Sequence, residues 1–146
     1  DVMEDIIPPV SNLSRLAERP SLRATHFPST SVNYLLFNQR SRGDSTRPHP
    51  IFTDMEVRRA LTIALDRALI AKALFGKYAS PASSPAAPAA WFGALAPEPA
   101  AFDPKQALRI LAARGWKDSD GDGVLDRVGI DGRRRGVDVD EHGCRA

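Results

Sequence analysis

The densest group of side chains that could do chemistry is an acidic, glycine-containing stretch at residues 118–126, which reads DSDGDGVLD. Carboxylates stand at positions 1, 3, 5 and 9 of this stretch, namely Asp118, Asp120, Asp122 and Asp126. Position 6 is Gly123. These spacings repeat the first part of an EF-hand-like calcium loop, where oxygen ligands surround the ion and a glycine at position 6 makes the sharp turn. The four aspartates are therefore a candidate calcium site.

Two interpretations of this stretch stay open. Position 12 is Gly129 instead of the bidentate glutamate of an EF-hand, so a calcium ion would need a ligand from elsewhere in the protein. In the alternative interpretation the stretch is a tight polar turn between a helix and a strand, in which aspartate side chains accept hydrogen bonds from backbone amides. No other cofactor is expected.

The sequence carries no motif of a known catalytic centre. It has no Gly-x-Ser-x-Gly elbow, no phosphate-binding glycine loop and no His-Glu-x-x-His pair. The histidines His26, His49 and His142 share no metal-ligand spacing, and a lone Cys144 forms neither an intrachain disulfide nor a cysteine metal cluster. An Arg-Gly-Asp tripeptide at residues 42–44 is better explained by chance than by an adhesive function. We therefore predict a protein that is not an enzyme.

Two apolar stretches predict strands. Residues 32–38, VNYLLFN, are mostly β-branched, aromatic or leucine without helical spacing, which predicts a strand buried on both faces. Residues 22–27 alternate apolar and polar side chains, which predicts a half-exposed strand that could pair with the first one.

Helix signals follow the first of these stretches. Thr53 and Glu56 have the spacing of a capping box, so a helix should begin near Asp54. Its apolar stripe is followed by a second apolar face that begins near Asp66 and ends at Gly76, which predicts two consecutive helices.

Prolines delimit the remaining elements. Pro9 opens a predicted helix that ends before Pro20. The alanine and proline content of residues 79–101 predicts a long surface loop, and Asp103 followed by proline predicts a further helix that closes at Gly115.

Composition limits the classes of protein that remain. With 146 residues, 42% hydrophobic and 26% charged, the chain has the size and balance of one globular domain. The net charge is only +2 and basic residues are scattered outside the arginine run at 133–135, so no nucleic-acid partner is expected. The sequence has neither an apolar stretch of membrane-spanning length nor a signal-peptide pattern, and it opens on Asp1, which fits a chain cut from a longer precursor.

Several segments together resemble one known family. YLLFNQR, PIFTDMEVRRALTIALDRALI and LFGKYASPA resemble the signature segment of the extracytoplasmic solute-binding proteins, family 5, of peptide, dipeptide and nickel ABC importers. FDPKQALRILAARGWKDSDGDGVLDRVG is similar to the next segment of that family. The resemblance covers residues 1–130 in the order of the family.

The resemblance implies an α/β fold: part of one lobe of a type II periplasmic-binding-protein-like (venus-flytrap) receptor, a mixed sheet with flanking helices. It implies a fragment of the substrate-binding component of a peptide-type ABC transporter, which captures oligopeptides or similar small solutes and delivers them to permease subunits. The location implied is periplasmic or extracytoplasmic. The matching residues Arg58, Arg59, Asp66 and Arg67 are expected to serve the scaffold, with Asp54 pairing to Arg58, and no ligand-binding residue is carried over.

A competing hypothesis is a calcium-binding structural or adhesive module built on residues 118–126. The chain also departs from the family after residue 130. Residues 131–146 carry charges of both signs and few apolar groups, which predicts a disordered, non-family tail that buries little apolar surface.

Overall fold

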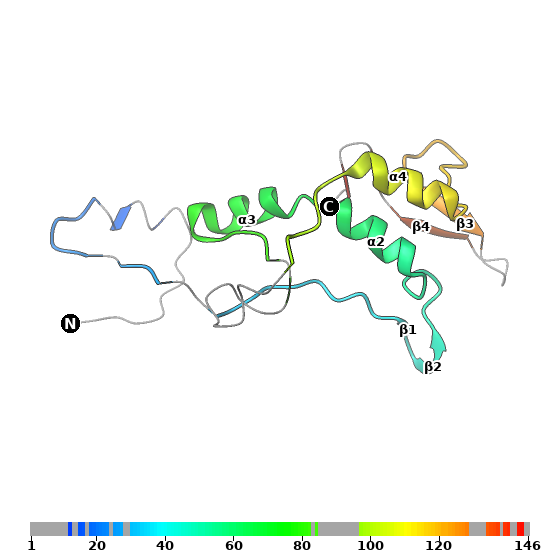
Figure 1. Ribbon diagram of the computed structural model, residues 1–146, viewed down its shortest axis with the longest axis horizontal. Coiled ribbons are helices and arrows are strands. Elements are labelled where there is room, and N and C mark those ends of the chain that lie inside the picture. Colours follow the sequence, from blue (N-terminus) through cyan, green and yellow to red (C-terminus); the bar gives the residue numbers. More distant parts are fainter. Residues whose placement is uncertain are drawn as a thin grey trace. The chain divides into compact units, whose positions relative to one another are not determined.

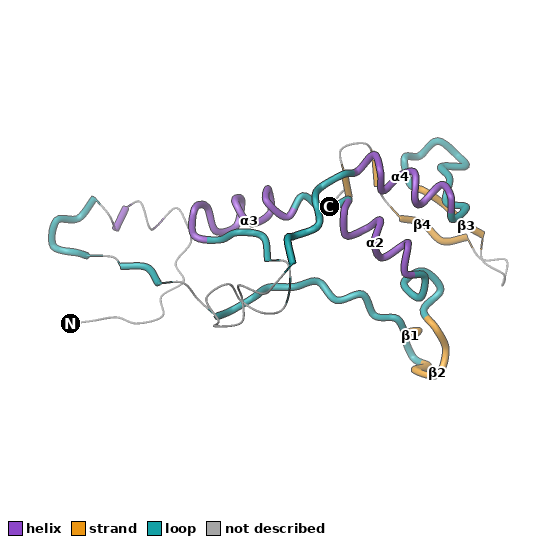
Figure 2. Tube along the Cα trace, viewed as in Figure 1, coloured by secondary structure: helices purple, strands orange, loops and turns teal. Residues whose placement is uncertain are grey.

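Figure 1 shows the computed structural model of the chain, coloured along the sequence, and Figure 2 shows its helices, strands and loops. The structure describes residues 12, 15–16, 18–23, 25–27, 30–82, 84, 97–128, 134–137, 139–140 and 143–144. The chain forms two compact units, the first made of Asp1–Val32 and Arg67–Pro99 and the second of Asn33–Asp66 and Ala100–Ala146. The acidic stretch at residues 118–126 belongs to the second unit.

Helix α2, Met55–Ile63, begins where the sequence predicts. Its N-cap is Asp54, whose carboxylate accepts a 2.9 Å hydrogen bond from the backbone N–H of Glu56. The buried side chains of the helix are Val57, Ala60, Leu61 and Ile63. The first three belong to the apolar stripe that the sequence predicts, whereas Ile63 does not. The prediction of Thr53 as the capping residue is wrong, because its hydroxyl donates to the carbonyl oxygen of His49 at 2.6 Å.

Helix α4, Pro104–Ala113, packs against α2 (Figure 1). Asp103 caps it as predicted, accepting a 2.8 Å hydrogen bond from the N–H of Gln106. The backbone N–H of Asp103 donates to the carbonyl oxygen of Ile63 at 2.8 Å, which ties the start of α4 to the end of α2. After the helix, Gly115 takes a φ of 81°, a left-handed conformation that suits glycine.

The hydrophobic core of the second unit forms around α2 and α4. Ala107 and Leu111 of α4 are 0% exposed. Trp116 is 1% and Val139 is 2% exposed, so the segment after α4 and the C-terminal part of the chain both contribute to the core. The guanidinium carbon of Arg127 lies 4.9 Å from the centroid of a Trp116 ring, which covers the indole with a cation–π contact.

The strands of the described residues form three separate two-stranded antiparallel sheets. The strands are β1 Arg40–Ser41, β2 Asp44–Pro48, β3 Leu125–Val128, β4 Arg134–Val137, β5 Val139–Asp140 and β6 Gly143–Cys144. In the β3–β4 pair, Leu125 lies opposite Val137 and Val128 lies opposite Arg134. The predicted mixed sheet therefore differs from the sheets that the described residues form. Each strand pairs with its neighbour in sequence, which a short connection permits only in the antiparallel orientation.

The prediction of a disordered tail at residues 131–146 is wrong for the part of that stretch that the structure describes. Strand β4 pairs along its length with β3, and Val139 is buried against α4. Val137 and Val139 are two residues apart and both pack on the core, so the stretch has the period of a half-buried strand in spite of its many charges. The domain division after residue 130 stays a prediction.

Residues 32–38 do not form the predicted buried strand. The side chains of Tyr34, Leu35 and Leu36 are 78%, 71% and 79% exposed. Phe37 turns toward the core, with its ring centroid 5.2 Å from that of Phe52. A strand needs a neighbour for its backbone N–H and C=O groups, and no segment that the structure describes pairs with this one.

In the first unit, the described elements are helix α3, Arg67–Phe75, and the short 3₁₀ helix η1, Gly76–Tyr78. The predicted second helix is confirmed, with Gly76 at a φ of 60° after its last residue. Leu69 and Leu74 of α3 are 61% and 62% exposed. This helix thus presents an apolar surface.

Other predictions for the first unit have mixed outcomes. The expected strand at residues 22–27 is wrong, because its described residues have no strand pairing. His26 is exposed and contacts the edge of Tyr78, with ring centroids 5.5 Å apart. Most of the expected helix at residues 9–19 and of the loop at 79–101 lies outside the described residues.

Candidate functional site

The acidic stretch forms a closed loop between α4 and β3. Its two ends are joined by a pair of backbone hydrogen bonds, from Lys117 N–H to the carbonyl oxygen of Asp126 at 2.9 Å and back at 2.7 Å. Within the loop, Gly121 and Gly123 adopt φ values of 78° and 84°. These left-handed conformations let the chain turn tightly enough to bring several aspartates together.

Two of the aspartates bind backbone amides of the loop. The Asp118 carboxylate accepts hydrogen bonds from the N–H of Gly121 at 2.7 Å and of Gly123 at 3.0 Å. Asp122 accepts one from the N–H of Val124 at 2.8 Å. These are the contacts of the polar-turn interpretation, in which the side chains stabilise the turn directly.

Arg134 of β4 binds the other two aspartates. Its guanidinium lies 2.6 Å from the carboxylate of Asp120 and 3.1 Å from that of Asp126, and it also donates to the hydroxyl of Ser119. The hydrogen bond from Arg134 lowers the pKa of Asp120 below its ordinary value of 3.8, and the same bond raises the pKa of Arg134. Arg134 thus supplies positive charge to the loop from a neighbouring strand.

The sequence interpretation missed Arg134 because it assigned that residue to a disordered tail. A detectable signal was present, since Leu125 and Val137 are the apolar ends of two short stretches that can pair as a hairpin. In that pairing Arg134 lies opposite Val128, and its side chain reaches Asp120 and Ser119 of the acidic loop.

Three of the four predicted calcium ligands lie in an arrangement that is compatible with binding one ion. Asp118, Asp120 and Asp122 each offer a carboxylate oxygen, and these oxygens lie within 4.8 Å of one another. Asp126 is not one of this group; its carboxylate accepts from Ser119 at 2.9 Å and pairs with Arg134. Calcium takes six to eight oxygen ligands, so the three carboxylates would form only part of a complete site.

Replacing Arg134 with glutamine should raise the pKa of Asp120 toward 3.8, because the hydrogen bond and the charge that lower it are removed. A pKa lowered in the folded state contributes stability above 3.8, and this contribution is lost as the pH falls below that value. A carbon-13 NMR titration of the aspartate carboxyl groups measures the change. The exposed Arg109 of α4 provides the control, since Arg109→Gln removes an equal charge and should leave Asp120 unchanged. An unaltered Asp120 titration in the Arg134 variant would contradict this assignment.

Other residues singled out in the sequence have structural roles. Arg58 donates to the carbonyl oxygens of Phe52 and Thr53 at 2.7 and 3.0 Å, so the predicted pairing of Arg58 with Asp54 is wrong. Asp54 lies instead 3.6 Å from Arg114, across the α2–α4 contact. Since both side chains hold the start of α2 to its surroundings, they serve the scaffold.

The Arg-Gly-Asp tripeptide lies at the turn of the β1–β2 hairpin, where Gly43 has a φ of 85°. The Asp44 carboxylate accepts from the N–H and hydroxyl of Thr46 at 3.0 and 2.6 Å and lies 3.0 Å from Arg47. The hydrogen bonds from Thr46 lower the pKa of Asp44 below its ordinary value. Asp44 is thus bound within its own hairpin.

Comparison with known proteins gives the class of this chain. Residues 2–135 match the family model of the bacterial extracellular solute-binding proteins, family 5 Middle. Because the match covers most of the chain, the chain belongs to this family of solute-binding proteins. The oligopeptide-binding protein AppA of Bacillus subtilis (strain 168) is 38% identical to it over 81 residues, which are 54% of this chain and 15% of AppA. No solved structure matches the chain.

Membership of the family bears on the class of protein, on its location and on its fold. Solute-binding proteins are a non-enzymatic class, so the prediction that the protein is not an enzyme is confirmed. The family is named for extracellular proteins, which implies an extracytoplasmic location. The combination of helices and strands in the described residues is consistent with part of such a domain. None of the helices that the structure describes combines the length and apolar character required to cross a bilayer.

Proposed function

We propose that residues 1–130 form part of one lobe of a type II, venus-flytrap receptor, and that the intact receptor captures oligopeptides or similar small solutes. It delivers them to the permease subunits of an ABC importer, from the periplasm or the equivalent extracytoplasmic space. The observation that carries this proposal is the family match over residues 2–135. Nothing in the proposal assigns a ligand contact to an individual residue of this chain.

Two further observations support the proposal. The similarity to a relative whose name specifies oligopeptide binding favours peptides among the possible solutes. In the second unit, the α2–α4 pair buries a continuous core while Tyr34, Leu35 and Leu36 stay exposed. An apolar surface of this kind is what a lobe shows where further parts of a receptor cover it.

A thermal-shift screen of the full-length protein tests the choice of ligand. A ligand that binds only the folded state raises the melting temperature, and the rise grows with the logarithm of the ratio of ligand concentration to dissociation constant. We expect short oligopeptides to raise it, and single amino acids, sugars and nickel complexes at equal concentration to leave it unchanged. A rise with nickel complexes and none with peptides would overturn the assignment to peptides.

The convergence of three carboxylates favours a second candidate function, a calcium site at Asp118, Asp120 and Asp122. In this proposal calcium replaces the guanidinium of Arg134 on Asp120. Calorimetric titration should then show micromolar binding that Asp120→Ala abolishes and that Glu98→Ala, which removes an exposed acid elsewhere, does not alter. Absence of heat in the unsubstituted chain would rule this function out and leave the polar turn.

A further inference from the structure

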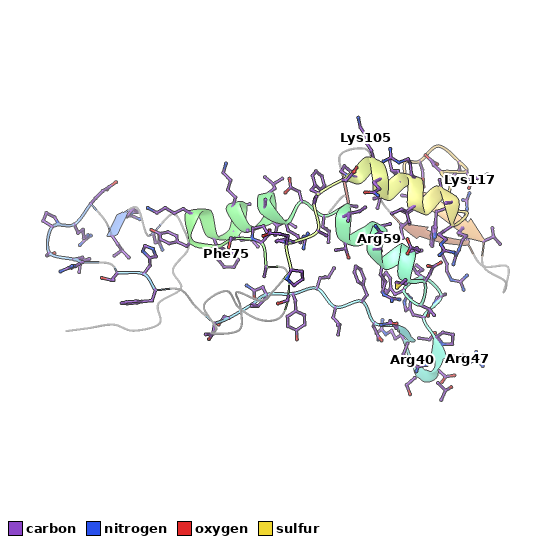
Figure 3. All side chains as sticks on the ribbon, in the orientation of Figure 1. Arg40, Arg47, Arg59, Phe75, Lys105 and Lys117 are labelled. Carbon is purple, nitrogen blue, oxygen red and sulfur yellow. The ribbon has the colours of Figure 1, made fainter. Side chains whose placement is uncertain are left out.

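The β1–β2 hairpin concentrates positive charge. Residues 40–47 read RSRGDSTR, so three arginines and one aspartate give the hairpin a net charge of +2, equal to that of the whole chain. Arg40, Arg42 and Arg47 are all exposed. Arg40 and Arg47 are seen on the hairpin in Figure 3, and Figure 1 shows that the hairpin projects beyond the N-terminal end of α2 and away from α4. The hairpin thus presents three guanidinium groups to solvent.

Local contacts hold the hairpin and with it the spacing of its arginines. The hydroxyl of Ser41 donates to the carbonyl oxygen of Pro48 at 2.9 Å. Arg40 lies opposite Pro48 in the register of the two strands, and Arg47 is the next residue of the second strand. At the tip, Gly43 takes a φ of 85°, the left-handed conformation that the tight turn requires. The arginines are therefore held close together on one short hairpin.

Two of the three guanidinium groups are available to another molecule. The Arg47 guanidinium lies 3.0 Å from the carboxylate of Asp44, which supplies the opposing charge. Arg40 and Arg42 form no ion pair with any residue that the structure describes. A guanidinium presents its N–H donors in a planar fork that matches the oxygens of carboxylate and phosphate groups. The hairpin is thus suited to contact anionic oxygens.

The composition of the hairpin indicates which kind of anionic partner fits it. Residues 40–47 contain no apolar or aromatic side chain. An interface with a folded protein buries a core of such side chains, and the hairpin has none to contribute. A surface of anionic lipid headgroups makes no such demand, because it attracts exposed lysine and arginine side chains through charge alone. The chemistry of the hairpin therefore fits a lipid surface better than a protein.

We propose that the β1–β2 hairpin binds the headgroups of anionic phospholipids, with Arg40 and Arg42 as its main contacts. The phosphate oxygens accept hydrogen bonds from both guanidinium groups, and the carboxylate of Asp44 limits the affinity through its opposing charge. Each arginine near such a surface strengthens binding about fivefold, so the hairpin binds weakly and reversibly. Contact of this kind raises the concentration of an extracytoplasmic receptor next to the membrane that holds its permease, a role that rests on the proposed function.

Sedimentation of the 146-residue chain with lipid vesicles tests the proposal. At an ionic strength of about 0.01 M, where the Debye length is about 30 Å, we expect the chain to sediment with phosphatidylglycerol vesicles and not with phosphatidylcholine vesicles. An increase to about 0.15 M shortens the Debye length to about 8 Å and should release most of the chain. Binding to both kinds of vesicle, or to neither, would overturn the proposal. No peptide ligand enters the measurement, so its failure would leave the proposed function untouched.

Matched variants locate the binding on the hairpin. The double variant Arg40→Gln/Arg42→Gln should bind phosphatidylglycerol vesicles about thirtyfold more weakly, since each arginine contributes about fivefold. Lys105→Gln/Arg109→Gln removes the same charge from exposed positions of α4 and should weaken binding by less than about threefold. Asp44→Asn should strengthen binding about fivefold, because it removes the opposing charge while its side-chain oxygen can still accept the hydrogen bonds of the turn.

Two outcomes with these variants would assign the charge of the hairpin differently. Equal losses in the two double variants would show that the net charge of the whole chain binds the vesicles. A soluble polyglutamate peptide that binds the chain more tightly than the vesicles do, and that loses its affinity only for the Arg40→Gln/Arg42→Gln variant, would assign the hairpin to an acidic protein. Either outcome would overturn the proposal.

Discussion

Replacing Trp116 with alanine should lower the free energy of unfolding by about 3–5 kcal/mol, the loss expected when a large aromatic side chain is removed from a packed core. Trp116 is 1% exposed and packs with buried side chains of both α2 and α4. Its removal also takes away the surface on which Arg127 stacks. Since folded domains are stable by only about 5–15 kcal/mol, much of the population should unfold.

Urea denaturation followed by far-ultraviolet circular dichroism measures this loss. Tyr34→Ala serves as the control, because this aromatic side chain is 78% exposed and its removal should cost less than about 1 kcal/mol. Trp116→Phe tests the same site without a large cavity. The indole Nε1 is buried and has no hydrogen-bond partner among the residues that the structure describes, so phenylalanine removes an unsatisfied polar atom and should cost less than alanine. Equal stabilities of the Trp116→Ala and Tyr34→Ala variants would show that Trp116 is not in the core.

Replacing Val139 with aspartate should cost about 3–5 kcal/mol, the penalty of leaving a buried charge without a partner. Val139 is 2% exposed and lies in β5, which packs against α4. The result therefore tests whether the C-terminal part of the chain belongs to the folded unit.

Val128 provides a matched control for Val139. It is also a valine in a short strand, but it is 66% exposed, so Val128→Asp should change the stability by about 0.5 kcal/mol or less. If both aspartate variants unfold at the same urea concentration as the unsubstituted chain, residues 134–144 contribute nothing to the core and a disordered tail is the better description.

The starts of the helices were predictable because their signals are local. Asp54 and Asp103 each stand directly before an apolar-periodic stretch, and each carboxylate binds an N–H within three residues. Contacts of this length depend only on the neighbouring sequence. For the same reason the polar turn at Asp118 and Asp122 could be anticipated, with its bonds to amides two to five residues away.

The contributions of Arg134 and Val139 could not be derived in the same way. Arg134 reaches Asp120 only because β4 pairs with β3, and Val139 is buried only because the chain returns to α4. Both contacts depend on tertiary pairing, which overrides a local composition rich in charge. Residues 32–38 show the reverse case, since an apolar stretch with high strand propensity stays exposed where no described strand lies beside it.

The most direct test of the proposed function is isothermal titration of one short oligopeptide into the 146-residue chain and into the full-length protein that we propose carries it. In the receptor that we propose, two lobes enclose the ligand, so one partial lobe lacks the opposing contacts and the closure that excludes water. We predict micromolar or tighter binding by the full-length protein and binding at least about a hundredfold weaker by the chain alone, a difference of about 2.7 kcal/mol. Submicromolar binding by the isolated chain, or no peptide binding by the full-length protein, would contradict the account.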